Sequence, residues 1–163
     1  MPAKRRRGRS PRAERGVAPR YTVDASVFVN AFNPREAGHG ASFAFLSAIR
    51  DRGNPVIVPT LVVPEVAAAV ARAAGDAIGA LQYATAIAAL PHFTLVSLTP
   101  EVARQAADLA AAYRLRGADA VYVAIARRYG TTIVSRDVEQ KTRGAAAIAC
   151  QTPEEALDLS LEP

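Results

Sequence analysis

The chain of 163 residues contains very little cysteine and histidine, and each scarcity excludes a class of site. With a single cysteine, Cys150, it forms no internal disulfide, which is typical of a protein in a reducing cytoplasm. Its two histidines, His39 and His92, lie far apart and lack the spacing of zinc ligands. Both histidines are therefore expected to be loop or surface residues.

Long apolar runs and a phosphate-binding glycine loop are also missing. No apolar run approaches the roughly 18 residues that a membrane-spanning helix needs, so we expect no association with a membrane. The glycines of residues 38–40 stand outside the pattern of a phosphate loop. Half of the residues are hydrophobic and 21% are charged, which indicates one folded domain rather than a disordered chain.

The net charge of +5 is unevenly distributed along the chain. Residues 1–20 contain eight Lys or Arg and one Glu (+7), whereas residues 21–163 contain twelve basic and fourteen acidic residues (−2). No apolar segment follows the first arginines, so a secretory or twin-arginine signal is not expected. Residues 1–20 are predicted to form a disordered basic arm, which could be only a solvated tail or could attract nucleic acid by its charge. The candidate nucleic-acid-binding residues in this arm are Lys4, Arg5, Arg6, Arg7 and Arg9.

Short apolar segments alternate with helical patterns over residues 21–163. Strands are predicted at 21–29, 55–59, 94–98, 131–135 and 146–150, and helices at 41–53, 61–75, 76–90, 99–115, 118–129 and 153–159. Continuous apolar strands that alternate with helices are typical of a parallel sheet covered on both faces. The predicted fold class is α/β, a three-layer α/β/α sandwich with a central, mostly parallel sheet.

Four acidic residues stand beside apolar sequence at the ends of these elements. Asp24 interrupts the apolar segment YTVDASVFV, where an unpaired buried carboxylate would cost several kcal/mol. Glu65 and Asp119 lie near helix starts, in VVPEVAAAV and GADAVYVAIA, and Asp137 follows TTIVS. Taken singly, Glu65 could interact with the helix dipole, Asp119 could cap its helix, and Asp137 could form a turn. The interior of a strand offers Asp24 none of these roles.

Convergence in one pocket would explain the four acids together. Ligands of parallel sheets bind beyond the carboxyl ends of the strands, which is where Asp24 and Asp137 are predicted to lie. Carboxylates gathered there would raise one another's pKa, and a divalent cation would relieve the repulsion. Oxygen ligands favour Mg²⁺ or Mn²⁺ over zinc, and a pair of such ions suits phosphodiester hydrolysis.

The segments that contain these acids resemble a known family. VDASV, PEV, ADAVYVAIA and IVSRD, in this order, look like the corresponding segments of PIN domains, and specifically of the VapC-type toxins of prokaryotic toxin–antitoxin pairs. The resemblance covers residues 21–159. It implies an α/β/α fold and a ribonuclease that uses Mg²⁺ or Mn²⁺. Cleavage would proceed by in-line attack of water on phosphorus, without a covalent intermediate.

The resemblance also implies a role for each acid. By position, the catalytic residues would be Asp24, Glu65, Asp119 and Asp137. Asp24 and Asp119 would ligate the metal directly, whereas Glu65 and Asp137 could reach the metal through water, and Asp137 could instead position the attacking water. The residues expected to support them lie close to Asp24 or Asp137 in the sequence and are Ser26, Ser135 and Glu139. For Ser26, packing within the predicted strand is an equally good explanation.

We therefore expect a cytoplasmic, metal-dependent endoribonuclease, the toxin of a two-protein module. The resemblance implies a homodimer and a cognate antitoxin that blocks the acidic pocket with a basic side chain. The alternative is a PIN-like domain that binds RNA or a protein without cleavage. A phosphatase of the haloacid dehalogenase type is excluded because Ser26 stands where a second aspartate is needed. A receiver domain is excluded because the segment PVIVP is followed by Thr60 rather than by a phospho-acceptor acid.

Overall fold

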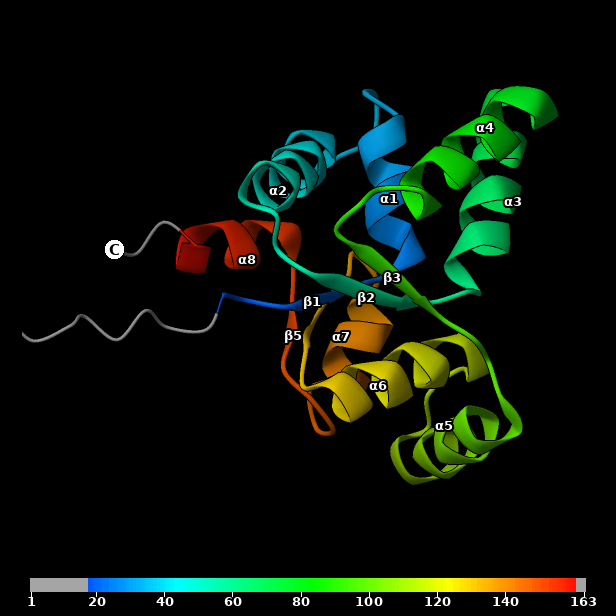
Figure 1. Ribbon diagram of the computed structural model, residues 1–163, viewed down its shortest axis with the longest axis vertical. Helices are drawn as coiled ribbons and strands as arrows, with labels where there is room; N and C mark the ends of the chain where they lie inside the picture. The colour runs from blue at the N-terminus through cyan, green and yellow to red at the C-terminus, as the bar shows by residue number, and fades with distance from the viewer. Residues whose placement is uncertain (1–17, 161–163) are drawn as a thin grey trace, which may run out of the picture.

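A five-stranded sheet forms the centre of residues 18–160, the part of the chain that the computed structural model describes (Figure 1). Its strands are β1 (Tyr21–Val23), β2 (Val56–Pro59), β3 (Phe93–Val96), β4 (Thr132–Val134) and β5 (Cys150–Gln151). The strand order is β3-β2-β1-β4-β5, and every neighbouring pair is parallel. Side chains of β1, β2 and β4 are buried almost throughout, as expected for strands covered on both faces.

Helices cover both faces of this sheet, as Figure 1 shows. One face carries α1 (Ala25–Phe32), α2 (His39–Arg52), α3 (Val62–Ala74) and α4 (Ala77–Ala88), with α8 (Pro153–Ser160) beside α2. The other face carries α6 (Gly117–Tyr129), against which α5 (Pro100–Tyr113) and α7 (Val138–Gly144) pack. The predicted three-layer α/β/α architecture is confirmed.

Helix α6 is the central element of its face. Residues 120–126 are all buried, because this helix contacts β1, β2 and β4 on one side and α5 and α7 on the others. A helix that is apolar all round is stable only in such surroundings. The burial of this run fixes the position of the first turn of α6, which contains Asp119.

The strand predicted over residues 21–29 is wrong in its second half. β1 ends at Val23, and α1 begins at Ala25 with Asp24 as its N-cap. The Asp24 carboxylate accepts a hydrogen bond from the backbone N–H of Ser26, which stabilises the first turn. Apolar residues of α1 are then buried against neighbouring helices, and this packing overrides their preference for strands. Asp24 therefore has the capping role that a strand interior would have denied it.

The structure differs from the predicted elements at two further places, both after β4 in the sequence. Helix α7 was not predicted, and it begins directly after Asp137, whose Oδ1 accepts hydrogen bonds from the N–H groups of Glu139 and Gln140. Strand β5 covers residues 150–151 instead of the predicted 146–150. The other predicted helices and strands are present with boundaries shifted by a few residues. Most of the predicted basic arm, including Lys4, Arg5, Arg6, Arg7 and Arg9, lies outside the described residues.

None of the helices within residues 18–160 combines the length and the apolar character that crossing a membrane requires.

Candidate active site

A pocket opens at the carboxyl ends of β1 and β4. These strands are neighbours in the sheet. The strands that follow β1 in the sequence, β2 and β3, lie on one side of it, whereas β5, which follows β4, lies on the opposite side. The strand order therefore reverses between β1 and β4. Open α/β sheets bind ligands at such a switch point. The pocket has a volume of about 770 Å³, and its acidic lining residues are Asp24, Glu36, Glu65, Asp119 and Asp137. The four predicted catalytic residues are thus together, although each comes from a different part of the fold.

Asp24 is the most buried of the four acids, with 7% of its surface exposed. Its Oδ2 atom accepts hydrogen bonds from the Ser26 backbone N–H at 2.9 Å and from Ser135 Oγ at 3.4 Å. Burial raises the pKa of this carboxyl and the charge of Asp137 adds to the effect, while the hydrogen bonds oppose it. The hydrogen bonds to Asp24 therefore offset only part of the cost of burying its negative charge.

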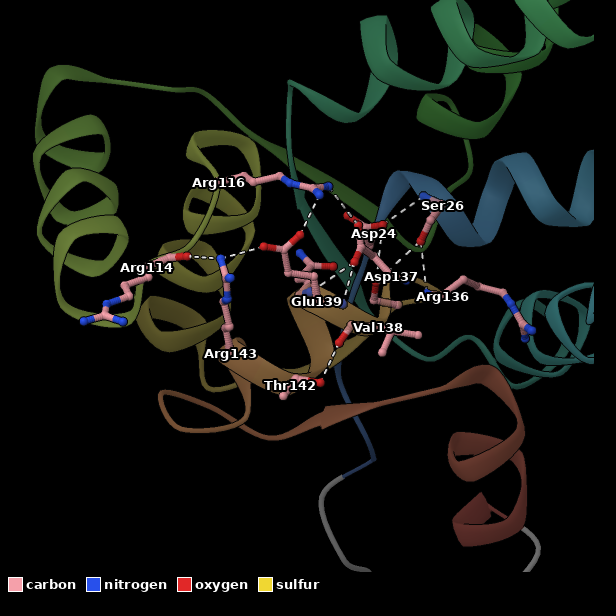
Figure 2. Close-up of polar contacts among 12 residues, drawn as sticks. Asp24, Ser26, Arg114, Arg116, Arg136, Asp137, Val138, Glu139, Thr142 and Arg143 are labelled. Atoms are coloured by element: carbon pink, nitrogen blue, oxygen red, sulfur yellow. Dashed lines mark hydrogen bonds and ion pairs between the residues drawn. The ribbon is translucent and has the colours of Figure 1, made fainter.

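Two serines, Ser26 and Ser135, connect the acids at the ends of β1 and β4, and Figure 2 labels Ser26 beside Asp24 and Asp137. Ser135 Oγ accepts a hydrogen bond from the Asp137 N–H at 3.0 Å and lies 3.4 Å from Ser26 Oγ. Ser26 Oγ in turn accepts from the Arg136 N–H at 3.0 Å. The predicted supporting residues Ser26 and Ser135 thus lie beside Asp24 and Asp137, and they hold the two strand ends in a fixed relation.

Glu65 enters the pocket from the first turn of α3. Its Oε2 accepts a hydrogen bond of 2.6 Å from the hydroxyl of Tyr122, which is fully buried. Burial raises the pKa of Glu65, and the charge of Asp24 contributes in the same direction. Tyr122 was not among the predicted site residues. Its position three residues after Asp119 would place both side chains on one face of a helix, which is the signal that could have identified it.

Asp119 lies in the first turn of α6 and carries the clearest sign of a missing partner. Its Oδ2 atom is buried and has no hydrogen-bond partner among the described residues. Burial, together with the charges of Asp24 and Asp137, raises its pKa to about 6, and Arg116 partly opposes this shift. A buried carboxylate oxygen without a partner is costly unless a proton or a cation satisfies it.

The donor set fits a hard divalent cation. The carboxylate oxygens favour Mg²⁺ or Mn²⁺, and the unpartnered Asp119 Oδ2 is available as a ligand. Within residues 18–160, no three His, Cys, Asp or Glu side chains are oriented as a complete metal cage. Asp24 and Asp137 each cap a helix, and Glu65 accepts a hydrogen bond from Tyr122. Mg²⁺ commonly uses only one or two carboxylates and keeps water for the rest, so a complete protein cage is not required.

The rim of the pocket also carries arginines, which the sequence had not singled out. They are Arg72, Arg116 and Arg136. Each stands within seven residues of a pocket acid in the sequence, which was the available signal. The third predicted supporting residue, Glu139, does not line the pocket, and its carboxylate binds Arg116 and Arg143 (Figure 2).

The fold and the site define a class of protein: a parallel α/β domain with a cluster of carboxylates at its switch point. Residues 21–145 match the model of the PIN domain, and the chain belongs to that family. The resemblance seen in the sequence is therefore confirmed. Among curated proteins, no sequence matches this chain.

Solved structures of toxins share this fold. Mycobacterium tuberculosis VapC20, described as a sarcin-ricin loop cleaving toxin, has a TM-score of 0.65 and 19% identity over 79% of this chain and 96% of that chain. A toxin–antitoxin complex from Klebsiella pneumoniae has a TM-score of 0.60 and 19% identity over 85% and 99%. VapBC2 from Rickettsia felis, bound to a DNA fragment from its promoter, has a TM-score of 0.62 and 11% identity over 82% and 98%. At these identities the similarity establishes the fold.

Proposed function

We propose that this protein is a metal-dependent endoribonuclease and the toxin of a toxin–antitoxin pair. The observation that carries the proposal is the meeting of four carboxylates, from four parts of the chain, in one pocket at the switch point. One protein of similar fold is described as cleaving the sarcin-ricin loop, and others were crystallised as toxin–antitoxin complexes, which supports RNA as substrate and an antitoxin as partner. The homodimer and the cytoplasmic location stay predictions from the sequence.

The proposed roles of the four acids are those that the resemblance to PIN domains implies. Asp24 and Asp119 would hold Mg²⁺ or Mn²⁺ directly, and Glu65 and Asp137 would act through water. When bound, the ion would supply the charge stabilisation that phosphodiester hydrolysis needs. Tyr122 donates a hydrogen bond to Oε2 of Glu65 and so holds this carboxylate in place, and we propose that Glu65 acts as a proton acceptor. The raised pKa of Glu65 suits that role, because a stronger base accepts a proton more readily.

Cleavage of RNA should require the metal. Incubating the full chain with a mixture of single-stranded and structured RNA should give defined fragments with Mg²⁺ or Mn²⁺ and none with a chelator. A gel that separates the fragments measures this directly. Intact RNA in both metals, together with a shifted band in a binding gel, would instead support the non-cleaving RNA-binding module.

The basic arm is proposed to attract RNA, since residues 21–163 alone carry a net charge of −2. Its removal should weaken RNA binding and flatten the salt dependence. On a single strand, each phosphate contact adds roughly 0.7 to the slope of log affinity against log salt concentration. The loss of three contacts would therefore reduce this slope by about 2. The deletion should stop at residue 17, because the Pro19 and Arg20 carbonyls accept hydrogen bonds from Asn54 and Thr132.

Binding of a labelled RNA is to be measured at several salt concentrations, in a chain that carries Asp24→Asn so that the RNA stays intact. A second chain, of full length but with the basic residues of the arm replaced by glutamine, separates charge from chain length. An unchanged salt slope in both would reject this role for the arm.

A further inference from the structure

One arginine of this chain already occupies the position of a counter-ion beside the pocket acids. Arg116 immediately precedes α6 and stands three residues before Asp119. Its guanidinium contacts Asp137 Oδ2 at 3.4 Å and Glu139 Oε2 at 2.5 Å (Figure 2). It also lowers the pKa of Asp119 through its charge. Arg116 therefore compensates part of the negative charge of the pocket.

The other two arginines of the rim are placed differently. Arg136 donates to Glu154 Oε1 at 2.7 Å, and its guanidinium lies so close to Gly38 that a Cβ there would come within 1.9 Å of Nη2. Arg72 is exposed on α3 and has no hydrogen bond or ion pair with a described residue. Within residues 18–160, Arg116 is thus the rim arginine that contacts an acid of the pocket.

Arg116 can exchange its present ion-pair partners for others at little cost. Its side chain is 64% exposed, and ion pairs in such contact with water contribute little to stability. A divalent cation bound among the carboxylates would take over the compensation of Asp137, because its charge and ligand geometry suit several oxygens at once. The guanidinium released from Asp137 is a planar donor that binds phosphate through two parallel hydrogen bonds.

We propose that Arg116 is a displaceable counter-ion that pairs with Asp137 in the metal-free protein and turns to a phosphate of the RNA once a divalent cation is bound. This inference rests on the proposed ribonuclease function. It makes Arg116 a substrate-binding residue whose availability depends on the metal. Metal and RNA would then bind cooperatively, because the metal frees the group that holds the RNA.

The proposal predicts that one substitution, Arg116→Gln, changes the affinities for Mn²⁺ and for RNA in opposite directions. Arg116→Gln removes a cation that competes for Asp137, so Mn²⁺ should bind more tightly. The same change removes a phosphate ligand, so RNA should bind less tightly. We expect the Mn²⁺ dissociation constant to fall about threefold and the RNA dissociation constant to rise about tenfold, with a loss of roughly 0.7 in the salt slope. An arginine that only supported the fold would cause neither change.

Two further variants separate this role from simpler ones. Arg143→Gln is the matched control, because Arg143 binds the same carboxylate, Glu139, and has the same charge but does not line the pocket. It should leave both dissociation constants within about twofold, since an exposed charge outside the pocket is largely screened by salt. Arg116→Lys keeps the charge and loses the planar donor, so it should preserve Mn²⁺ affinity and still weaken RNA binding.

Both affinities are to be measured on the full chain. Mn²⁺ binding is measured without RNA, by calorimetry or by loss of the free-ion electron paramagnetic resonance signal. RNA binding is measured as fluorescence anisotropy of a labelled single strand in Ca²⁺, with a gel to verify that the strand stays intact. Thermal unfolding of each variant checks that the fold is preserved.

The outcomes are distinct. If wild-type protein binds no Mn²⁺, the proposed function fails and the inference falls with it. If wild-type protein binds Mn²⁺ but Arg116→Gln and Arg143→Gln give the same two affinities, the proposed function stands and the role of Arg116 is overturned. Tighter Mn²⁺ binding by Arg116→Gln with unchanged RNA binding would also overturn it, because the phosphate contact would be absent.

Discussion

Asp24→Asn should abolish metal-dependent RNA cleavage while the protein stays folded. Asp24 is the most buried acid of the pocket and is proposed as a direct metal ligand. An amide is a much weaker ligand for Mg²⁺ than a carboxylate. If the ion contributes about 4 kcal/mol to transition-state stabilisation, its loss slows cleavage about a thousandfold. The measurement is the initial rate of RNA cleavage at saturating Mn²⁺.

The substitution is informative because it should leave the fold unchanged. Asparagine caps a helix about as well as aspartate, so its side-chain oxygen can still accept the Ser26 N–H at the start of α1. The variant also removes a buried carboxyl whose pKa is raised by burial. We expect its unfolding free energy to stay within about 1 kcal/mol of wild type.

Asp76→Asn provides the matched control for this experiment. It makes the same acid-to-amide change at another helix N-cap, because Asp76 begins α4 and accepts a hydrogen bond from the Gly79 N–H, but it is exposed and does not line the pocket. Its cleavage rate should stay within a few-fold of wild type. Full cleavage by Asp24→Asn, or an equal loss in Asp76→Asn, would contradict the assignment of Asp24 as a ligand.

Mn²⁺ should stabilise the protein strongly near pH 7.5 and weakly near pH 5. An ion present at about 100 times its dissociation constant adds about 2.7 kcal/mol, which raises the melting temperature of a chain of this size by roughly 5–10 °C. At low pH the acids hold protons instead. Asp119, whose pKa is raised to about 6, is mostly protonated at about pH 5 and must lose its proton before it can bind the ion.

The metal-free protein should show the opposite dependence on pH. The folded state holds the Asp119 proton more tightly than the unfolded chain, because burial raises this pKa from 3.8 to about 6. The contribution of Asp119 to stability is therefore fully present below about pH 4 and is lost as the pH rises through about 6. Burial raises the pKa of Asp24 and Glu65 as well, so these acids act in the same direction.

Differential scanning fluorimetry between pH 4 and 8, with and without Mn²⁺, tests both statements. Asp119→Asn should remove much of the metal-free pH dependence and reduce the shift caused by Mn²⁺. Stabilisation by Mn²⁺ that is equal at both pH values would show that the ion binds elsewhere. A metal-free pH dependence that Asp119→Asn leaves unchanged would show that burial does not hold the proton on Asp119.

Local patterns in the sequence identified the four acids but gave the wrong secondary structure around Asp24 and Asp137. The segment 21–29 is apolar and β-branched, so a strand was the natural prediction, yet it folds as a three-residue strand followed by α1. The choice depends on helices that are distant in sequence and bury the apolar face of α1. Helix α7 escaped prediction because residues 138–144 are mostly polar and show no apolar period.

The amino-acid sequence by itself determined the class of fold, the family and the identities of the four acids, because alternating apolar segments and short motifs are local properties of a chain. Only the tertiary structure decided which groups from distant parts of the chain each acid meets. Two of these contacts join separate elements: the hydrogen bond from Tyr122 to Glu65 and the ion pair of Arg116 with Asp137. The unpartnered Oδ2 of Asp119 depends on burial by the surrounding fold. Such contacts exist only once the sheet has brought β1 and β4 together, since no spacing along the chain encodes a distance between two elements.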